Sequence, residues 1–402
     1  MQKKVKKIPI SNSIVLVNFL RLKNMRKAVK TYKTDEKRYL IHFDVIILSI
    51  FAHAIKMHHK DSIKKGWREM NKVVLPIEEK PAICCYHNMA FPLSIIQGCS
   101  KSIGKDCTSW MIGKYLNCVY YTNSPGNDYG ICIDDWWGWE EGVLIHQCMD
   151  FLPELIKSLN ATPLDIVKHM IKNGCYVSGG FNEKYIPGKS AFGKYDYHHD
   201  YLIYGYDDYE SVLYSIGYLS QRKYVPFKIK YVDFSCAIDD NLQPKKSFEI
   251  WKYNSEYEFS INIPRIRTCF TDYYNSTTSY GKREKALYGF EANEKLKEYI
   301  QKFAIASNRR RIDDRYTRAF MEHKRMVLLC AKLLQRLAEN YIAPFTTVYE
   351  KSCSIFSLSL KYNIDKDKNE ISRICNLFDE IFQIEKGVIK SFIIDLSGSV
   401  SI

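Results

Sequence analysis

The sequence lacks a hydrophobic run long enough to cross a membrane. Its most apolar window, residues 39–55, is interrupted by His42, Asp44 and His53. The basic start also lacks the features of a secretory signal, because the apolar run at residues 14–17 is short and no small-residue cleavage site follows it. These absences argue against a membrane protein and predict a cytoplasmic location.

Cysteine patterns typical of disulfides or metal sites, internal repeats and low-complexity segments are also missing. The 13 cysteines show neither CxxC pairs nor the regular spacing of a disulfide framework. We therefore expect most of them to be small buried hydrophobic residues. With 402 residues, 46% of them hydrophobic and 26% charged, the chain has the composition of a globular protein of two or three units.

The positive charge is concentrated at the N-terminus. Residues 1–80 contain 19 Lys and Arg against 7 Asp and Glu, so they carry +12 of the total +14. Such an excess favours an acidic partner, either nucleic acid or an acidic carrier protein. No recognised nucleic-acid-binding motif accompanies the charge, which disfavours the first. A lysine-rich surface that only keeps the protein in solution explains the charge equally well.

The most informative stretch is residues 195–218. Polar and apolar residues alternate from His199 to Tyr204, residues 205–208 lead into a turn, and residues 212–216 return. This pattern predicts an antiparallel hairpin with one buried face. A histidine at its open end would lie beside the core, where a general base belongs.

The flanking segments predict an α+β protein. Residues 158–173 read as a helix that begins at Thr162-Pro163-Leu164-Asp165, and strand-like runs follow at residues 175–181, 224–232 and 248–253. Beyond Tyr288 the chain has helical spacing and few glycines, at residues 294–307, 312–343, 346–362 and 370–392. We therefore expect a basic N-terminal cap (residues 1–75), a mixed catalytic domain (residues 76–285) and a C-terminal helical domain (residues 286–402).

Two adjacent cysteines, Cys84 and Cys85, precede an apolar segment at residues 93–97 that we expect to be helical, with Pro92 opening or kinking the helix. A cysteine at such a helix start gains thiolate character from the positive helix end. A cysteine followed later by a histidine describes the papain-like plan, in which the thiol attacks a carbonyl, the imidazole handles the proton and a third group fixes its tautomer.

Three motifs together resemble the butirosin-biosynthesis-H-type N-terminal domain family of the papain-like superfamily. They are Cys85-Tyr86-His87-Asn88-Met89-Ala90, then Lys172-Asn173-Gly174-Cys175-Tyr176-Val177, then His199 six residues before Gly205-Tyr206-Asp207-Asp208. Tyr288-Gly289-Phe290-Glu291-Ala292 and Glu322-His323-Lys324 are similar to the helical part of such proteins. The resemblance covers roughly residues 75 to 390. It implies a papain-like fold, with a cysteine-bearing helix on an antiparallel sheet that carries the histidine, and a C-terminal helical bundle.

The resemblance also implies a function. Family members resemble acyltransferases that take an acyl group from a carrier-protein thioester and give it to an amine, as do the papain-fold amide synthases of nonribosomal antibiotic biosynthesis, including the closthioamide type. Cys85 would then receive the acyl chain from a phosphopantetheine thioester and His199 would deprotonate the amine, for which a diamine is one candidate. Lys23, Arg26 and Lys27 would dock the acyl or peptidyl carrier protein, and Trp136, Trp137 and Trp139 would line the acyl site.

Alternatives at these positions stay open. Cys85 is preferred to Cys84 because the family's cysteine precedes an aromatic residue, and His199 is preferred to His198 because of its spacing to Gly205. Apart from the carrier's phosphopantetheine we expect no cofactor. We also expect no metal, because side chains of adjacent strand residues diverge, which disfavours a site at residues 198–200. Trp136 to Trp139 also suit core packing.

The sequence departs from the family pattern at Gly217, where an aspartate is expected on the return strand. If Gly205 pairs near Val212, His199 lies opposite Tyr218, and the two aspartates of the turn lie about 25 Å away. Asp200 would point to the other sheet face. The orienting group is then the Tyr218 hydroxyl, a backbone carbonyl or a group from elsewhere. A cysteine peptidase or amidase, and a non-catalytic scaffold that retains the fold, remain the alternative functions.

Overall fold

The computed structural model describes residues 72–122, 130–133, 142–150, 161–220, 223–238, 247–279, 284–305 and 311–398. These all belong to one compact unit, Asn71–Ile402. Nearly all of the predicted N-terminal cap lies outside the described residues. So do the predicted docking residues Lys23, Arg26 and Lys27 and the predicted acyl-site residues Trp136, Trp137 and Trp139.

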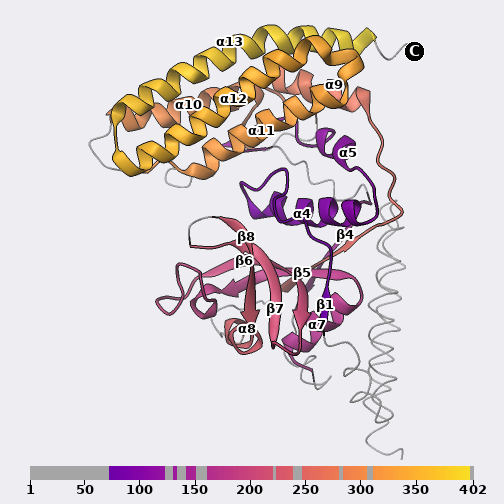
Figure 1. Ribbon diagram of the computed structural model, residues 1–402. Coiled ribbons are helices and arrows are strands. Elements are labelled where there is room, and N and C mark those ends of the chain that lie inside the picture. The colour runs from indigo at the N-terminus through magenta and orange to yellow at the C-terminus, as the bar shows by residue number, and fades with distance from the viewer. Residues whose placement is uncertain are drawn as a thin grey trace, which may run out of the picture. The chain divides into compact units, whose positions relative to one another are not determined.

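The predicted antiparallel sheet is confirmed, and its central hairpin is the one expected from the alternating stretch (Figure 1). All pairings described between its strands are antiparallel. In spatial order the strands are β4 (Leu144–Asp150), β9 (Ser247–Tyr253), β5 (Cys175–Asn182), β6 (His198–Asp207), β7 (Val212–Tyr218) and β8 (Tyr224–Lys230), while β1 (Lys72–Val74) pairs with the far end of β6.

The register of the hairpin differs from the expected one. Gly205 pairs with Tyr214 and not near Val212, and the register shifts by one residue between Ile203 and Gly205. The turn is shorter than assumed because Asp207 Oδ1 accepts hydrogen bonds from the backbone N–H groups of the second and third residues after it, at 3.0 and 3.2 Å. Pairing therefore begins directly at Asp207 and Val212.

Helix α4 (His87–Ser102) packs on one face of this sheet, against β6 and β9 (Figure 1). Most of its side chains are buried, and Met89 and Ile95 share one core with Leu202 and Trp251 of the sheet. Pro92 lies inside the helix, so the helix begins before the proline and not at it. The segment Cys84–Tyr86 is consequently fixed at the N-terminal end of α4.

The opposite sheet face carries a second layer. Because alternate residues of a strand face opposite sides, Tyr201 points away from α4, and its ring stacks on Phe181 with 4.2 Å between ring centroids. Helices α7 (Pro163–Lys172) and α8 (Tyr231–Ile238) both contact β5. The predicted start of α7 is confirmed, since Thr162 and Asp165 form a reciprocal capping box.

The predicted C-terminal helical bundle is also confirmed. It contains α9 (Ile263–Tyr274), α10 (Gly289–Ile305), α11 (Asp314–Leu333), α12 (Gln335–Asp365) and α13 (Lys368–Gly398). Beside it lie α5 (Thr108–Ile112) and a three-stranded sheet of β10 (Ala286–Tyr288), β2 (Cys118–Tyr121) and β3 (Gly130–Ile133). The architecture is therefore mixed α+β, and no described helix is long and apolar enough to cross a membrane.

One helix boundary in the bundle was predicted wrongly. The expected break between residues 343 and 346 does not occur, because Pro344 lies inside α12, and the chain turns at Leu334 instead. A proline removes one helical hydrogen bond, and the extensive packing of α12 between α11 and α13 outweighs that loss.

Candidate active site

A cavity of about 340 Å³ brings together residues from five parts of the chain. The cysteine segment, the loop after β5, the end of the strand that carries His199, the end of β7 and the first turn of α11 all contribute. Its lining includes Cys84, Cys85, Tyr86, His87, Glu183, Lys189, Ser190, Tyr197, His199, Tyr218, Leu219, Ser220, Asp314, Arg315 and Arg318. The two residues predicted to be catalytic, Cys85 and His199, therefore share one cavity.

A carboxylate from the helical bundle holds the cysteine segment in place. Glu322 Oε2 accepts hydrogen bonds from the backbone N–H of Cys84 (3.1 Å) and of Cys85 (2.9 Å), and the Cys84 thiol donates to Glu322 Oε1 at 3.2 Å. Cys85 is 2% exposed and Glu322 is 3% exposed. Glu322 thus occupies the backbone donors that precede α4.

These surroundings make the thiols weaker acids, contrary to the expected thiolate character. Burial and then the Glu322 carboxylate raise the pKa of Cys84 from 9.0 to about 12, and the same two causes raise the pKa of Cys85. The three-unit change at Cys84 corresponds to about 4 kcal/mol, whereas a helix N-terminus contributes typically about 0.3–1 kcal/mol. Both thiols are therefore protonated in this conformation.

The imidazole of His199 has a carboxylate beside it that was not predicted. Glu183 begins the short 3-10 helix η2 (Glu183–Tyr185), and its Oε1 lies 3.7 Å from His199 Nδ1. The same nitrogen is 3.2 Å from the backbone oxygen of Asp200. Glu183 also forms an ion pair with Lys189 at 3.1 Å, and both side chains are almost completely buried. The position of Glu183 is therefore well fixed.

Gly217, where the family pattern places an aspartate, lies in close contact with its neighbour. A Cβ atom added to Gly217 would be 3.0 Å from Cβ of Tyr201, so Tyr201 would have to give by a few tenths of an ångström to accept a side chain there. The hydroxyl of Tyr218 donates to the backbone oxygen of Cys84 at 2.8 Å. Tyr218 thus ties the cysteine segment to β7, and the group found beside His199 Nδ1 is the carboxylate of Glu183.

A second imidazole lies next to the first. The rings of His87 and His199 are 5.8 Å apart between centroids, and His87 Nε2 is 3.3 Å from Asp200 Oδ2. Burial lowers the pKa of His87, and Asp200 partly offsets this effect. Asp200 is thus the residue that faces α4, and alternation along the strand directs the His199 side chain to the other face at the strand end.

Three cationic side chains also line the cavity. Arg318 Nη1 is 3.7 Å from Cys84 Sγ, Arg315 is paired with Asp313, and Lys189 donates from Nζ to the backbone oxygen of Tyr218 at 2.6 Å. Burial lowers the pKa of Lys189, while Glu183 acts in the opposite direction.

Sequence reasoning missed Glu183, Lys189 and Arg318 as site residues, and it noted Glu322 only as part of a resemblance. Only a weak pattern in the sequence pointed to two of these residues. Arg318 and Glu322 are four residues apart on a helix whose buried side is otherwise largely apolar, which marks them as neighbours on one face.

Comparisons with known proteins add no assignment. No family model matches the chain, and a search of curated proteins found no match. A functional interpretation therefore depends on the geometry of the cavity.

Proposed function

We propose that the protein is a cysteine-dependent acyltransferase with a papain-like catalytic domain. The observation that supports this most directly is that Cys85 and His199, from segments far apart in the sequence, line the same cavity. Cys85 precedes a helix packed on an antiparallel sheet, and His199 lies on that sheet. A thiol and an imidazole in one cavity are the two groups that nucleophilic catalysis by a cysteine uses.

The reaction proceeds through an acyl-enzyme. The Cys85 sulfur attacks a thioester carbonyl, and the carrier thiol leaves with a proton. The amine then attacks the enzyme thioester, His199 accepts a proton from the amine, and the C–S bond breaks. The products are an amide and the free Cys85 thiol. Glu183 orients His199 and stabilises its protonated form during the second step.

The substrate is best described as an acyl group on a phosphopantetheine carrier protein. Arg315 and Arg318 line the cavity, and such cationic groups suit the phosphate of that arm. The basic N-terminal residues 1–80, with a net charge of +12, suit an acidic carrier. On this proposal the protein acts in amide-forming steps of nonribosomal biosynthesis.

The proposal requires a rearrangement of Glu322. The Cys85 N–H is a natural donor to the oxyanion of the tetrahedral intermediate, and in the resting arrangement it is bonded to Glu322 Oε2. Substrate binding therefore has to displace Glu322 or protonate it. Burial already raises the pKa of Glu322, which favours the protonated form.

Intact-protein mass spectrometry tests the proposal. The protein is incubated with a small acyl thioester, with and without a diamine, and compared with Cys85→Ala and with the matched control Cys84→Ala. An acyl adduct that forms on the native protein and on Cys84→Ala, that is absent from Cys85→Ala, and that the diamine releases as amide supports the proposal. Release to water at the same rate without amine would indicate a hydrolase. No adduct with several thioesters would indicate a binding scaffold.

A further inference from the structure

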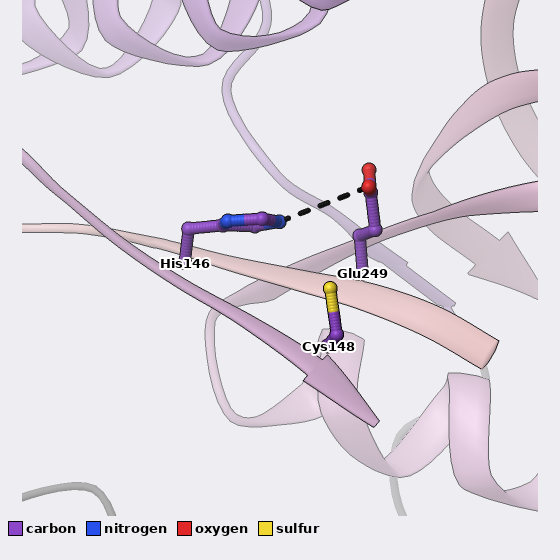
Figure 2. A group of neighbouring side chains, drawn as sticks. All are labelled: His146, Cys148 and Glu249. Atoms are coloured by element: carbon purple, nitrogen blue, oxygen red, sulfur yellow. Dashed lines mark ion pairs between the residues drawn. The ribbon is translucent and has the colours of Figure 1, made fainter. Parts of the chain in front are cut away.

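Three potential metal ligands lie side by side on the edge of the large sheet. In the register of β4, β9 and β5, Cys148 pairs with Glu249, which pairs with Ser178, and in the next row His146 pairs with Trp251. Paired residues of neighbouring antiparallel strands share a face, and so do residues two apart on one strand. His146, Cys148 and Glu249 therefore project from the same face, as Figure 2 shows.

The three side chains converge. One ligand atom from each residue, the ring nitrogen of His146, Sγ of Cys148 and a carboxylate oxygen of Glu249, lies within 4.8 Å of the others. Ligand atoms around a tetrahedral zinc ion, with bonds of about 2.0–2.3 Å, are roughly 3.5 Å apart. Binding would therefore bring the three ligand atoms closer together by up to roughly 1.3 Å.

Neighbouring residues hold two of the ligands in position. The ring of His146 stacks on Trp251 with 3.9 Å between centroids. Trp251 Nε1–H donates to Ser178 Oγ at 2.8 Å, and the Ser178 hydroxyl donates to Glu249 Oε2 at 2.9 Å. Outer hydrogen bonds of this kind orient the ligands of metal sites and leave the second carboxylate oxygen, Oε1, directed at His146.

The nitrogen that faces the carboxylate lacks a hydrogen bond. His146 Nε2 is inaccessible to solvent and has no hydrogen-bond partner among the described residues. It is 4.0 Å from Glu249 Oε1, the dashed line in Figure 2, which is too long for a hydrogen bond. A buried polar atom without a partner costs free energy, and a bound cation between the two atoms would satisfy both.

We propose that His146, Cys148 and Glu249 form a binding site for a divalent transition metal, with Zn²⁺ the best match. A thiolate, an imidazole and a carboxylate are the three kinds of zinc ligand in proteins, whereas Ca²⁺ and Mg²⁺ require oxygen ligands. Three protein ligands leave a fourth position for water or a small anion. Cys148 is exposed, so the metal can enter from solvent.

The site is separate from the cavity that contains Cys85, since none of its three ligands lines that cavity. A failure of the acyltransferase proposal would therefore leave the metal-binding proposal unaffected, and the reverse also holds. The sequence analysis predicted no metal. The spacing of His146 and Cys148, two residues apart on a strand, is the only trace of the site in the sequence. That spacing indicates a metal site only once the pairing of β4 with β9 adds Glu249.

Zinc titration of the full-length protein tests the site. Zn²⁺ is added in competition with a chromophoric chelator to the native protein and to Cys148→Ser, His146→Gln and Glu249→Gln. Cys236→Ser removes another exposed cysteine and is the matched control. We expect one zinc ion per chain in the native protein and in Cys236→Ser, and at least 100-fold weaker binding in each ligand variant. Ser178→Ala, which removes an outer hydrogen bond, should weaken binding about 10- to 100-fold.

A second measurement locates the metal. Co²⁺ alone should give a thiolate-to-metal charge-transfer band in the native protein that is absent from Cys148→Ser. Bound Zn²⁺ should also slow alkylation of Cys148, read at the peptide level, and leave Cys236 unaffected. Circular dichroism checks that each variant is folded. Zinc affinity that is equal in the native protein and in folded Cys148→Ser, or no binding at all by the native protein, would overturn the proposal.

Discussion

Replacing Glu322 with glutamine should make Cys84 more reactive, because Glu322 is the negative charge nearest to its thiol. The carboxylate accepts the Cys84 S–H and both backbone N–H groups of the cysteine segment. Glutamine has nearly the same shape and no charge. The substitution therefore removes the repulsion between carboxylate and thiolate without opening a cavity.

The distance sets the size of the effect. With 3.2 Å between Cys84 Sγ and Glu322 Oε1, two unit charges repel by about 1.3 kcal/mol at the dielectric constant of water and by about 5 kcal/mol at an effective value of 20. The entire rise in the pKa of Cys84, from 9.0 to about 12, is about 4 kcal/mol, and burial is its largest cause. The repulsion of about 1.3 kcal/mol is therefore the one that agrees with this rise, and it corresponds to about one pKa unit of Cys84.

Alkylation with iodoacetamide measures this change, since only the thiolate reacts. At about pH 8 a thiol of pKa 12 is ionised to roughly one part in 10⁴, and a decrease of one unit raises that fraction about tenfold. Peptide-level mass spectrometry with fragmentation separates Cys84 from Cys85. The labelling rate of native Cys84 should keep rising with pH up to about pH 10 without reaching a plateau, because its pKa lies higher still.

Glu370→Gln is the matched control. Glu370 is also a buried carboxylate of the helical bundle, but it pairs with Lys361 and Arg373 and not with a cysteine. Its replacement should leave the labelling of Cys84 unchanged. If Glu322→Gln labels Cys84 no faster than the native protein does, while circular dichroism shows both to be folded, the electrostatic reasoning is wrong.

Three further predictions concern stability and the proposed mechanism. Lys324→Met should destabilise the protein by about 3–5 kcal/mol in urea unfolding, because it leaves Glu385 unpaired where both side chains are fully buried, and adding Glu385→Leu should recover most of the loss. Gly289→Ala should lower the free energy of unfolding clearly more than Gly174→Ala. Both glycines have positive φ, but only at Gly289 would the new Cβ lie 2.0 Å from a backbone oxygen, that of Tyr273. Equal losses of unfolding free energy would contradict this reasoning. Glu183→Gln should reduce amide formation on the order of 10²-fold and shift its pH profile while acyl-enzyme formation persists, and an unchanged profile would remove Glu183 from the mechanism.

The parts of the fold that follow from local patterns were predictable. The capping box of Thr162 and Asp165, the alternation from His199 to Tyr204 and the helical spacing beyond Tyr288 each depend on residues a few positions apart, and the structure has the corresponding elements. The break near Pro344 was not predictable in this way. A proline disfavours a helix locally, but the packing of α12 against two neighbouring helices decides the outcome.

The residues of the candidate active site show the same difference between local patterns, which could be predicted, and tertiary contacts, which could not. Cys85 and His199 could be selected because each has a distinctive neighbourhood in the sequence. Glu183 and Glu322 could not, because their relevance comes from pairing partners: Glu183 reaches His199 only through the register of β5 with β6, and Glu322 is 238 residues from Cys84. The protonated state of the thiols was missed for the same reason, since both burial and the carboxylate arise from tertiary packing.

The contacts of α11 make the helical bundle part of the candidate active site. Arg318 and Glu322 lie one turn apart on that helix, and both reach the cysteine segment, one with a positive and the other with a negative charge. If the Glu322 carboxylate moved away, the Arg318 guanidinium, 3.7 Å from Cys84 Sγ, would remain beside that thiol. The first raises the pKa of the Cys84 thiol and the second lowers it. Under the acyltransferase proposal, a carrier protein that draws Glu322 away on docking would therefore lower the pKa of the Cys84 thiol, remove the carboxylate that raises the pKa of Cys85 and release the Cys85 N–H in one step.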